Sequence, residues 1–431
     1  MPKSRYLTAK QATEALGVSA ATLYAYVSRG LIRSEAVAGD SRARRYHGED
    51  IQQLKEKQAL RRNPAKAAQD ALNWGAPVLE SALTLISDDK VCYRGVNALT
   101  LAQNNSIEQV AALLWTGRLE DSEALFSVIP DVSQIVAAVE SLRQTIPLSA
   151  MQRLEIALAL AGDSDLAAYA LRPDMVALSG ARILWLMANV LATATPLSPS
   201  PFSPRIRGER GAGQSQVTAS PSPDLVSLLQ SGWDLPGPDA AFLLNAALIL
   251  CADHELNVSS FTARVVASAG TQPYRVVAAG LAALQGFRHG GGTQRAADLL
   301  REVGERDRSR YVISEWLRRG ERIPGFGHRL YADGDPRGRF LLEQLAARYA
   351  ASPSVALVEA LTEAVWQAIG QRPNIDLGLA ALALALGLPA DGALSLFALG
   401  RTIGWIAHAS EQYGSGQMIR PRASYVGKPP V

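Results

Sequence analysis

Residues 324–337 have the sequence PGFGHRLYADGDPR, in which His328 follows two closely spaced glycines and precedes an arginine, Arg337. Residues 286–292, GFRHGGG, again combine one histidine, His289, with several glycines. Glycine has no side chain, so another backbone or a ligand can come close to such a segment. A single histidine is more often an ordinary core or surface residue, but two in this setting predict a binding site.

Further polar residues stand in otherwise apolar surroundings along the same half of the chain. His254 lies in the segment ADHELN, Arg401 precedes an apolar run, and Asp376 follows Pro-Asn-Ile. Arginine binds carboxylates through paired hydrogen bonds, so several arginines with several histidines suit a small dicarboxylate whose carbonyl is attacked. The position of Asp376 leaves two interpretations open: the N-cap of a helix, or a buried base with a raised pKa.

The histidines and cysteines do not have the spacing of metal ligands. No HExxH motif occurs, and the two cysteines, Cys92 and Cys251, form no CxxC motif and cannot build a disulfide framework. We therefore expect no bound metal, no resident cofactor and a reducing compartment.

The length and hydropathy of the chain predict a cytoplasmic protein of two or three domains. It has 431 residues, of which 48% are apolar, and no apolar run follows Met1. The most membrane-like stretch, residues 175–194, carries Arg182 near its middle. Because a bilayer span needs about 20 apolar residues, this stretch is expected to be a buried helix instead.

Residues 63–431 are expected to be almost entirely helical. Ala, Leu, Glu and Arg dominate, glycines and prolines punctuate the sequence, and no sustained alternation of apolar and polar residues indicates a sheet. Residues 195–223 differ, because they contain six prolines and six serines and offer little to bury. They predict a disordered surface insert within a helical domain.

Six segments of this helical region, taken in order, resemble the citrate synthase family. Two earlier stretches, residues 93–95 (YRG) and 107–110 (IEQV), resemble its N-terminal portion. The resemblance covers about residues 70–430, apart from the insert. The six segments are ADHELN (252–257), GFRHGG (286–291), PGFGHRLYADGDPR (324–337), PNID (373–376), GRTIGWIAH (400–408) and RPRASYVG (420–427).

The resemblance implies a mainly α, homodimeric enzyme. Its large domain would comprise residues 63–290 and 389–431, and its small domain residues 291–388, with the two closing over the substrates. The family condenses acetyl-CoA with oxaloacetate, and close relatives use propionyl-CoA to make 2-methylcitrate. Oxaloacetate and an acyl-CoA are therefore the expected partners, with CoA as a product.

The resemblance also implies roles for individual residues. Asp376 would remove a proton from the acyl group, His289 would stabilise the enol at the thioester carbonyl, and His328 would donate to the oxaloacetate carbonyl. The remaining positions match groups that hold the oxaloacetate carboxylates (His254, Arg337, Arg401), reach into the neighbouring subunit's site (Arg420) or belong to the CoA-binding loop (Ile323, Gly325, Phe326).

The sequence departs from the family pattern in three places. Residues 292–294 are Gly-Thr-Gln where the family has Ala-Asn-Glu, and residues 258–260 are Val-Ser-Ser where it has Ala-Ser-Thr. The segment after Asp376 lacks an aromatic residue and is about two residues short. The changes after His289 and after Asp376 fall beside these two residues, and the one at 258–260 is mild, so the three are expected to affect substrate choice and turnover more than the fold.

Residues 1–62 form a basic head with its own pattern. They hold twelve Lys or Arg against six Asp or Glu, a net charge of +6 in a chain of net charge +3. Thr8 is placed to cap a helix up to Leu16, and Ser19 to cap a second one that Gly30 ends. A hairpin with a turn at residues 39–40 is expected to follow, and a further helix from Asp50.

This head resembles helix-turn-helix domains of the MerR and excisionase type, which bind DNA. The residues expected on the recognition helix are Ser19, Thr22, Tyr24 and Tyr26, and those expected in the wing are Arg42, Arg44 and Arg45. A protein-interaction or relic module is the alternative for the head. For the whole chain, the alternative to an enzyme is a DNA-binding regulator that uses its body as a CoA or dicarboxylate sensor.

Overall fold

The computed structural model describes residues 6–37, 40–48, 50–51, 54, 79–87, 90–127, 129–193, 224–331, 333–423 and 425–428. The chain divides into two compact units, Met1–Glu80 and Ser81–Val431, and each is described by itself. The insert predicted at residues 195–223 lies outside the described residues.

The first unit is a helix-turn-helix with a three-stranded antiparallel sheet; the sequence predicts the two helices and the hairpin, but not the additional strand at Tyr6–Thr8. Thr8 caps the first helix in a capping box with Gln11, and Ser19 caps the second by accepting the backbone N–H of Thr22. The strands lie in the order β1-β3-β2. The elements are β1 (Tyr6–Thr8), α1 (Ala9–Leu16), α2 (Ala20–Ser28), β2 (Ser34–Val37) and β3 (Asp40–His47).

A small core of its own holds the first unit together. Leu23, Ile32, Tyr46 and Ile51 are each at most 2% exposed and form one cluster with Leu16. Fully burying an apolar side chain of this size contributes roughly 1.5–3 kcal/mol, so five of them join two helices and a sheet. The expected turn residue at position 39 lies outside the described residues.

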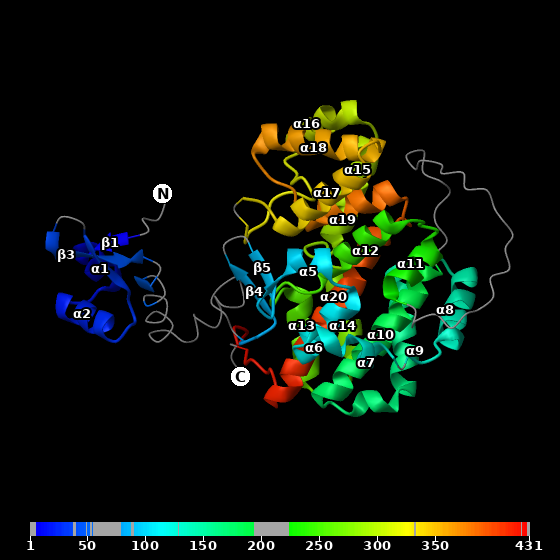
Figure 1. Ribbon diagram of the computed structural model, residues 1–431, viewed down its shortest axis with the longest axis horizontal. Helices are drawn as coiled ribbons and strands as arrows, with labels where there is room; N and C mark the ends of the chain where they lie inside the picture. The colour runs from blue at the N-terminus through cyan, green and yellow to red at the C-terminus, as the bar shows by residue number, and fades with distance from the viewer. Residues whose placement is uncertain are drawn as a thin grey trace. The chain divides into compact units, whose positions relative to one another are not determined.

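The described residues of the second unit are mostly helical, which confirms the predicted class (Figure 1). Short 3₁₀ helices lie at Leu119–Asp121 (η1), Leu166–Tyr169 (η2) and Arg306–Arg308 (η3). The α-helices are α5 (Ala98–Asn104), α6 (Ile107–Thr116), α7 (Ser122–Phe126), α8 (Ser133–Thr145), α9 (Ala150–Ser164), α10 (Pro173–Ala192), α11 (Leu225–Trp233), α12 (Pro238–Cys251), α13 (Val258–Ser268), α14 (Pro273–Leu284), α15 (Gly291–Val303), α16 (Ser309–Arg318), α17 (Pro336–Arg348), α18 (Pro353–Ile369), α19 (Ile375–Leu386) and α20 (Gly392–Ser415).

A second three-stranded sheet contradicts the expectation that this region lacks sheets. It consists of β4 (Thr84–Ser87), β5 (Lys90–Tyr93) and β6 (Val96–Asn97), paired antiparallel in that order. Strands of two to four residues are too short for alternation to stand out in a sequence. The sheet anchors the site, because the hydroxyl of Tyr93 donates to the carbonyl of Ile249 at 3.0 Å, just before the turn that carries His254.

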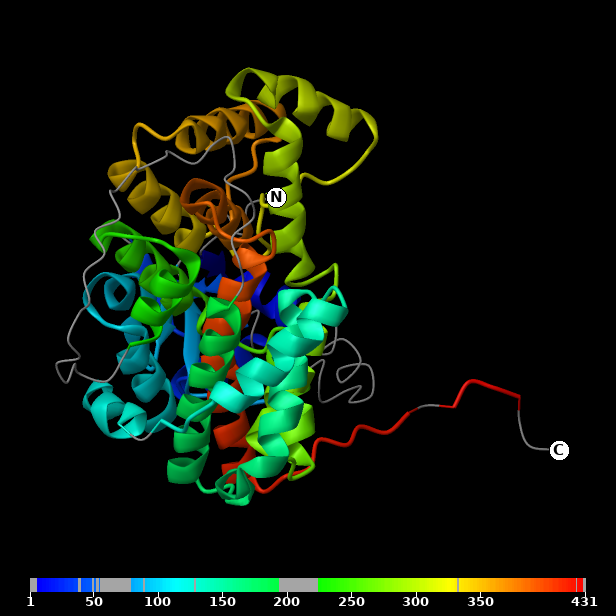
Figure 2. The same ribbon diagram turned by 90° about the vertical axis from the view of Figure 1, so that its right-hand side faces the viewer.

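Helix α20 runs through the middle of the second unit (Figures 1 and 2). It packs against α10, α12, α13 and α14. Two glycines bring it unusually close to its neighbours: a Cβ on Gly404 would lie 2.4 Å from the carbonyl oxygen of Ala252, and one on Gly280 would lie 2.6 Å from the Trp405 ring. Tight contact therefore fixes α20 against the turn that carries His254.

Helices α15 to α19 gather at one end of the second unit (Figure 1). Helix α19 packs against α15, α17, α18 and α20, so it links this end to the rest of the unit. The N-terminal ends of α15, α17 and α19 carry candidate site residues. The division into a large and a small domain at residues 290 and 388 stays a prediction.

Helix α10 is the one described helix that is long and apolar enough to cross a membrane. It covers most of the stretch that the sequence marks as membrane-like, and 67% of its most apolar 18-residue segment is buried inside the protein. Arg182 on this helix pairs with Asp165, with 2.9 Å between Nη1 and Oδ1. Its apolar composition is thus accounted for by packing in the core.

Candidate active site

His289 lies in the turn between α14 and α15, beside the first turn of α13. Its Nε2 is 2.8 Å from the hydroxyl of Ser259, which also accepts a hydrogen bond from Trp405 Nε1–H at 3.1 Å. The oxygen of Asn257 near this hydroxyl already accepts two backbone N–H groups, as the cap of α13. The Ser259 hydroxyl is also 2.8 Å from this oxygen, so its single proton can be donated either to Asn257 Oδ1 or to His289 Nε2.

His289 is a neutral hydrogen-bond donor at physiological pH. Burial, with a further contribution from the guanidinium of Arg401, lowers the pKa of this imidazole to about 4. The ring of Phe397 packs edge-on against it, with 6.0 Å between centroids. A neutral imidazole held in place by packing and by Ser259 suits a donor to an oxygen on which negative charge develops during a reaction.

The loop that carries His328 is tied to the segment before α19. Gly327 N–H donates to the carbonyl of Arg372 at 2.8 Å, and Asn374 donates through its backbone N–H to Gly325 at 2.9 Å and through Nδ2 to Gly327 at 3.1 Å. Gly325 and Gly327 have φ of +83° and +74°, a region that side chains other than glycine rarely adopt. The two glycines thus place His328 next to the start of α19.

His328 has a defined tautomer. Its Nδ1 accepts the backbone N–H of Leu330 at 3.1 Å, so the proton of the neutral ring is on Nε2. Burial lowers the pKa of this imidazole, and the positive charge of Arg337 lowers it further. His328 is therefore a neutral donor through Nε2 at physiological pH.

His254 lies close to His328 and within the electrostatic influence of Arg337 and Arg401. Its ring lies 5.3 Å from that of His328, and its Nε2 is 2.7 Å from the hydroxyl of Tyr331. Burial lowers its pKa well below the ordinary value, and the charges of Arg337, Arg401 and the other two histidines act in the same direction. His254, His289, His328, Arg337 and Arg401 therefore share one electrostatic environment, as their predicted roles require.

Asp376 lies in the first turn of α19 and does not cap it. Asn374 is the N-cap and accepts the backbone N–H groups of Asp376 and Leu377, so the N-cap interpretation of Asp376 is wrong. The carboxylate of Asp376 accepts a hydrogen bond from Thr293 Oγ1 at 2.5 Å. Desolvation raises the pKa of Asp376 to about 6, against the lowering effects of Thr293, Arg337 and Arg401.

Arg337 and Arg401 are cations that the fold keeps out of water. Arg337 is 2% exposed and pairs with the fully buried Asp335 through Nε and Nη2, at 3.0 and 2.8 Å. Arg401 is 1% exposed and donates from Nε to the carbonyl of Cys251 at 2.8 Å. A guanidinium has five N–H donors, so both keep donors for a bound carboxylate.

Arg420 and the residues of the expected CoA-binding loop have surroundings that differ from those of the polar groups described above. Arg420 is exposed and lies on the C-terminal segment, which extends away from the helices of its own unit (Figure 2). Ile323 and Phe326 of the expected CoA loop are buried, at 3% and 7% exposure, and Gly325 forms the turn between them. The structure thus joins the loop to the site but leaves Arg420 outside the site of its own chain.

Four residues belong to the site without having been given a role from the sequence. Tyr331 bonds His254, and Phe397 lies under the Arg401 guanidinium at 5.0 Å. Phe397 precedes Arg401 by four residues on α20, so helical spacing alone places this pair on one face. The contacts of Thr293 with Asp376 and of Ser259 with His289 join separate segments and leave no such signal.

The predicted DNA-binding residues of the head differ in their exposure and in their contacts. Tyr24 is 56% exposed on α2, and the Ser19 and Thr22 hydroxyls lie 2.9 Å apart at its N-terminal end, whereas Tyr26 is partly buried. Arg44 is exposed, but Arg45 pairs with Glu35 at 3.0 Å and lies over the Tyr6 ring. The side chain of Arg42 lies outside the described residues.

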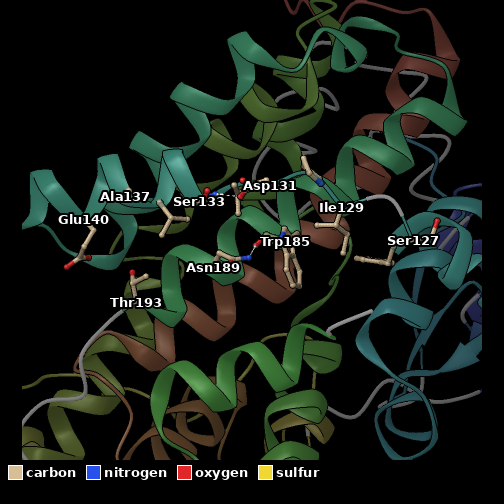
Figure 3. Close-up of a pocket in the computed structure, with 13 residues that line it drawn as sticks. Ser127, Ile129, Asp131, Ser133, Ala137, Glu140, Trp185, Asn189 and Thr193 are labelled. Atoms are coloured by element: carbon tan, nitrogen blue, oxygen red, sulfur yellow. Dashed lines mark hydrogen bonds between the residues drawn. The ribbon is translucent and has the colours of Figure 1, made fainter. Parts of the chain in front are cut away.

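A cavity of about 720 Å³ opens elsewhere, beside α8 and α10 (Figure 3). Val136, Glu140 and Trp185 are among its lining residues, and none of the predicted site residues lines it. Among the residues that the structure describes, no three His, Cys, Asp or Glu side chains are grouped to hold a metal ion. Both cysteines are free thiols.

Known proteins resemble both units. The sequence profile of the citrate synthase C-terminal domain matches residues 71–422, and that of a helix-turn-helix domain matches residues 6–59. Citrate synthase 2 of Bacillus subtilis is 29% identical over 374 residues, which cover 82% of this chain and 94% of that protein. Citrate synthase of Haloferax volcanii is 31% identical with the same coverage.

A third relative and a solved structure complete the comparison. The 2-methylcitrate synthase 1 of Corynebacterium glutamicum is 30% identical, covering 79% of this chain and 90% of that protein. The structure of Thermoplasma acidophilum citrate synthase with carboxymethyl coenzyme A and oxaloacetate superposes with a TM-score of 0.65 at 23% identity, over 83% of this chain and 95% of that one. The chain therefore belongs to the citrate synthase family of acyltransferases, with a helix-turn-helix domain ahead of its catalytic body.

Proposed function

We propose that the chain condenses an acyl-CoA with oxaloacetate, and that Asp376, His289 and His328 carry the chemistry. The observation that supports this most is the position of Asp376, in which the residue is partly buried and accepts a hydrogen bond from Thr293, and desolvation raises its pKa to about 6. A carboxylate poised near the working pH is suited to general base catalysis.

Each side chain has a distinct step in this mechanism. Asp376 removes a proton from the carbon next to the thioester, while His289 donates to the thioester oxygen and stabilises the enol. The enol carbon then attacks the carbonyl carbon of oxaloacetate, and Nε2–H of His328 donates to the oxygen that becomes a hydroxyl. Water finally cleaves the thioester and releases CoA. The chemistry uses no resident cofactor, because a base and two donors suffice.

The two arginines and His254 are proposed to hold oxaloacetate. Its two carboxylates need donors that are fixed in place, and hydrogen bonds hold Arg337 on Asp335 and Arg401 on the Cys251 carbonyl. Burial makes each charge–charge contact stronger than it would be in water. The ordered guanidiniums thus orient the oxaloacetate carbonyl toward His328.

Thiol release tests this function directly. Full-length protein is mixed with oxaloacetate and either acetyl-CoA or propionyl-CoA, and free CoA is followed with a thiol reagent. We expect release that depends on oxaloacetate with at least one of the two thioesters, and their kcat/KM ratio gives the acyl preference. Release at the same rate without oxaloacetate would identify a hydrolase and contradict the proposal.

We further propose that the active form is a homodimer in which Arg420 completes the partner's site. The C-terminal segment exposes large apolar side chains, with Met418 at 67%, Tyr425 at 75% and Val426 at 95% exposure. Apolar groups at such exposure on an extended segment are typical of a surface that another subunit covers.

Mixed dimers test the sharing of sites. R420A and D376N are each expected to be nearly inactive, but a co-refolded mixture should regain up to about a quarter of wild-type activity. In the mixed dimer, one site receives Asp376 from its own chain and Arg420 from the other. If Arg420 served its own chain, mixing would restore nothing.

We propose DNA binding as a second function, carried by the head. The support is the exposed Tyr24 and Arg44 together with the helix-turn-helix fold. A pure regulator with a sensor body is the weaker alternative, because binding a CoA ester or a dicarboxylate does not require a base such as Asp376. A cytoplasmic location fits both functions.

The salt dependence of duplex binding distinguishes the expected contributions of Arg44 and Arg45, two of the three arginines expected in the wing. Full-length protein should bind duplex DNA with log Kd rising by about 0.9 per log unit of salt for each phosphate contacted. R44A should lower this slope by about one contact, whereas R45A should change it less, because Glu35 already pairs with Arg45. No salt-dependent binding at low ionic strength would make the head a protein-interaction or relic module, and the enzyme proposal would stand.

A further inference from the structure

Thr293 makes a direct contact with the proposed base. It lies in the first turn of α15 and is fully buried, and its Oγ1 donates to Oδ1 of Asp376 at 2.5 Å. Its backbone N–H donates to the carbonyl of Gly290 at 3.0 Å, which fixes the start of the helix. The hydroxyl therefore reaches Asp376 from a rigid part of the backbone.

The second oxygen of Asp376 has different surroundings. A Cβ placed on Gly292 would lie 3.0 Å from Oδ2, so the glycine leaves open the space beside this oxygen. The two carboxylate oxygens are thus unequal: Oδ1 accepts a hydrogen bond from Thr293, and Oδ2 faces a residue without a side chain. Both neighbours belong to the Gly-Thr pair that departs from the family sequence.

We propose that Thr293 is a positioning residue, which holds Oδ1 of Asp376 and thereby makes Oδ2 the oxygen that removes the proton. The inference rests on the proposed condensation and names the structural feature that orients its base. A carboxylate that could rotate freely would present either oxygen, and proton transfer depends on a fixed short approach to the substrate carbon.

The hydroxyl also affects when the base is charged. A donor to the carboxylate stabilises its ionised form, as do the charges of Arg337 and Arg401, while burial and Asp335 oppose ionisation. Removing only the hydroxyl must therefore raise the pKa of Asp376. Because catalysis needs the ionised form, the acidic limb of the kcat profile must move to higher pH.

Two substitutions and a control separate the hydroxyl from packing. T293V keeps the shape of the side chain and removes the donor, whereas T293S keeps the donor and removes the methyl group. T402V is the matched control, since Thr402 is also fully buried but donates to the carbonyl of Ala398. For each variant, kcat and KM are measured from pH 5 to pH 9.

For T293V we expect the pH midpoint of the acidic limb of the kcat profile to move up by about one pH unit, which lowers kcat about tenfold below pH 6. The KM for oxaloacetate should stay unchanged, and T293S and T402V should follow the wild type. An unchanged limb in T293V, or a T293S variant as impaired as T293V, would overturn the proposal.

Infrared titration of the Asp376 carboxyl band measures the pKa of this group directly, without relying on turnover. D376N identifies the band, and its midpoint should be higher in T293V than in the wild type. A shifted midpoint in a protein without condensation activity would leave the contact standing and remove only the proposed function. An unshifted midpoint would overturn the role of Thr293 whatever the activity.

Discussion

D376N is expected to lose condensation almost completely while still binding oxaloacetate. Asn has nearly the same shape as Asp but cannot accept the proton, and removing a general base costs about 100- to 10,000-fold in rate. Oxaloacetate binding should survive, because its proposed ligands are Arg337, Arg401 and His254. Steady-state kcat and an oxaloacetate titration by calorimetry measure the two effects separately.

The pH dependence of the wild type gives an independent check. Asp376 has a pKa of about 6 and acts only when ionised, so kcat should be full above this pH and fall as the pH drops through it. A D376N variant that turned over at the wild-type rate would exclude Asp376 as the base.

R337Q is expected to unfold far more easily than the wild type. The substitution leaves the carboxylate of Asp335, which is fully buried, without its cation. Breaking a buried ion pair by removing one partner costs about 3–5 kcal/mol. Urea unfolding followed by circular dichroism measures this loss in the free energy of unfolding.

A double variant separates the structural role of Arg337 from its role in binding. D335N/R337Q has no buried charge at this place, so it should recover most of the lost stability, yet it should not recover affinity for oxaloacetate. R319Q is the control, because its partner Glu321 is about as exposed as Arg319 itself, and such surface pairs contribute only about 0–1 kcal/mol. An R337Q variant as stable as the wild type would contradict the structural role.

The sequence predicted those parts of the molecule that local chemistry determines. Thr8 and Ser19 cap their helices as expected, because an N-cap is a contact between residues three apart. Gly325 and Gly327 adopt the positive φ that makes glycine necessary beside His328. His254, His289 and His328 could be placed in one site only through the resemblance to a family, since they come from three separate segments.

The features that sequence reasoning missed depend on long-range contacts. The residues around Asp376 left a helix cap and a buried base both open; Asn374, two residues earlier, is the cap, and the carboxylate of Asp376 is bound by Thr293 on another helix. The ion pair of Arg45 with Glu35 across two strands was not predicted, and the DNA-binding role of Arg45 stays a prediction. The strands β4 to β6 were missed because their stability comes from packing, such as that of Tyr93 against α12, and not from a repeating pattern.

The central claim is that this chain forms a carbon–carbon bond between an acyl group and oxaloacetate. Mass spectrometry of the products from acyl-CoA labelled with ¹³C in the carbonyl carbon and the carbon next to it, mixed with unlabelled oxaloacetate, tests it most directly. The account predicts a tricarboxylate that carries both labelled carbons, formed in equal amount to the free CoA and absent with D376N. Free CoA accompanied only by labelled carboxylic acid, with no labelled tricarboxylate, would contradict it.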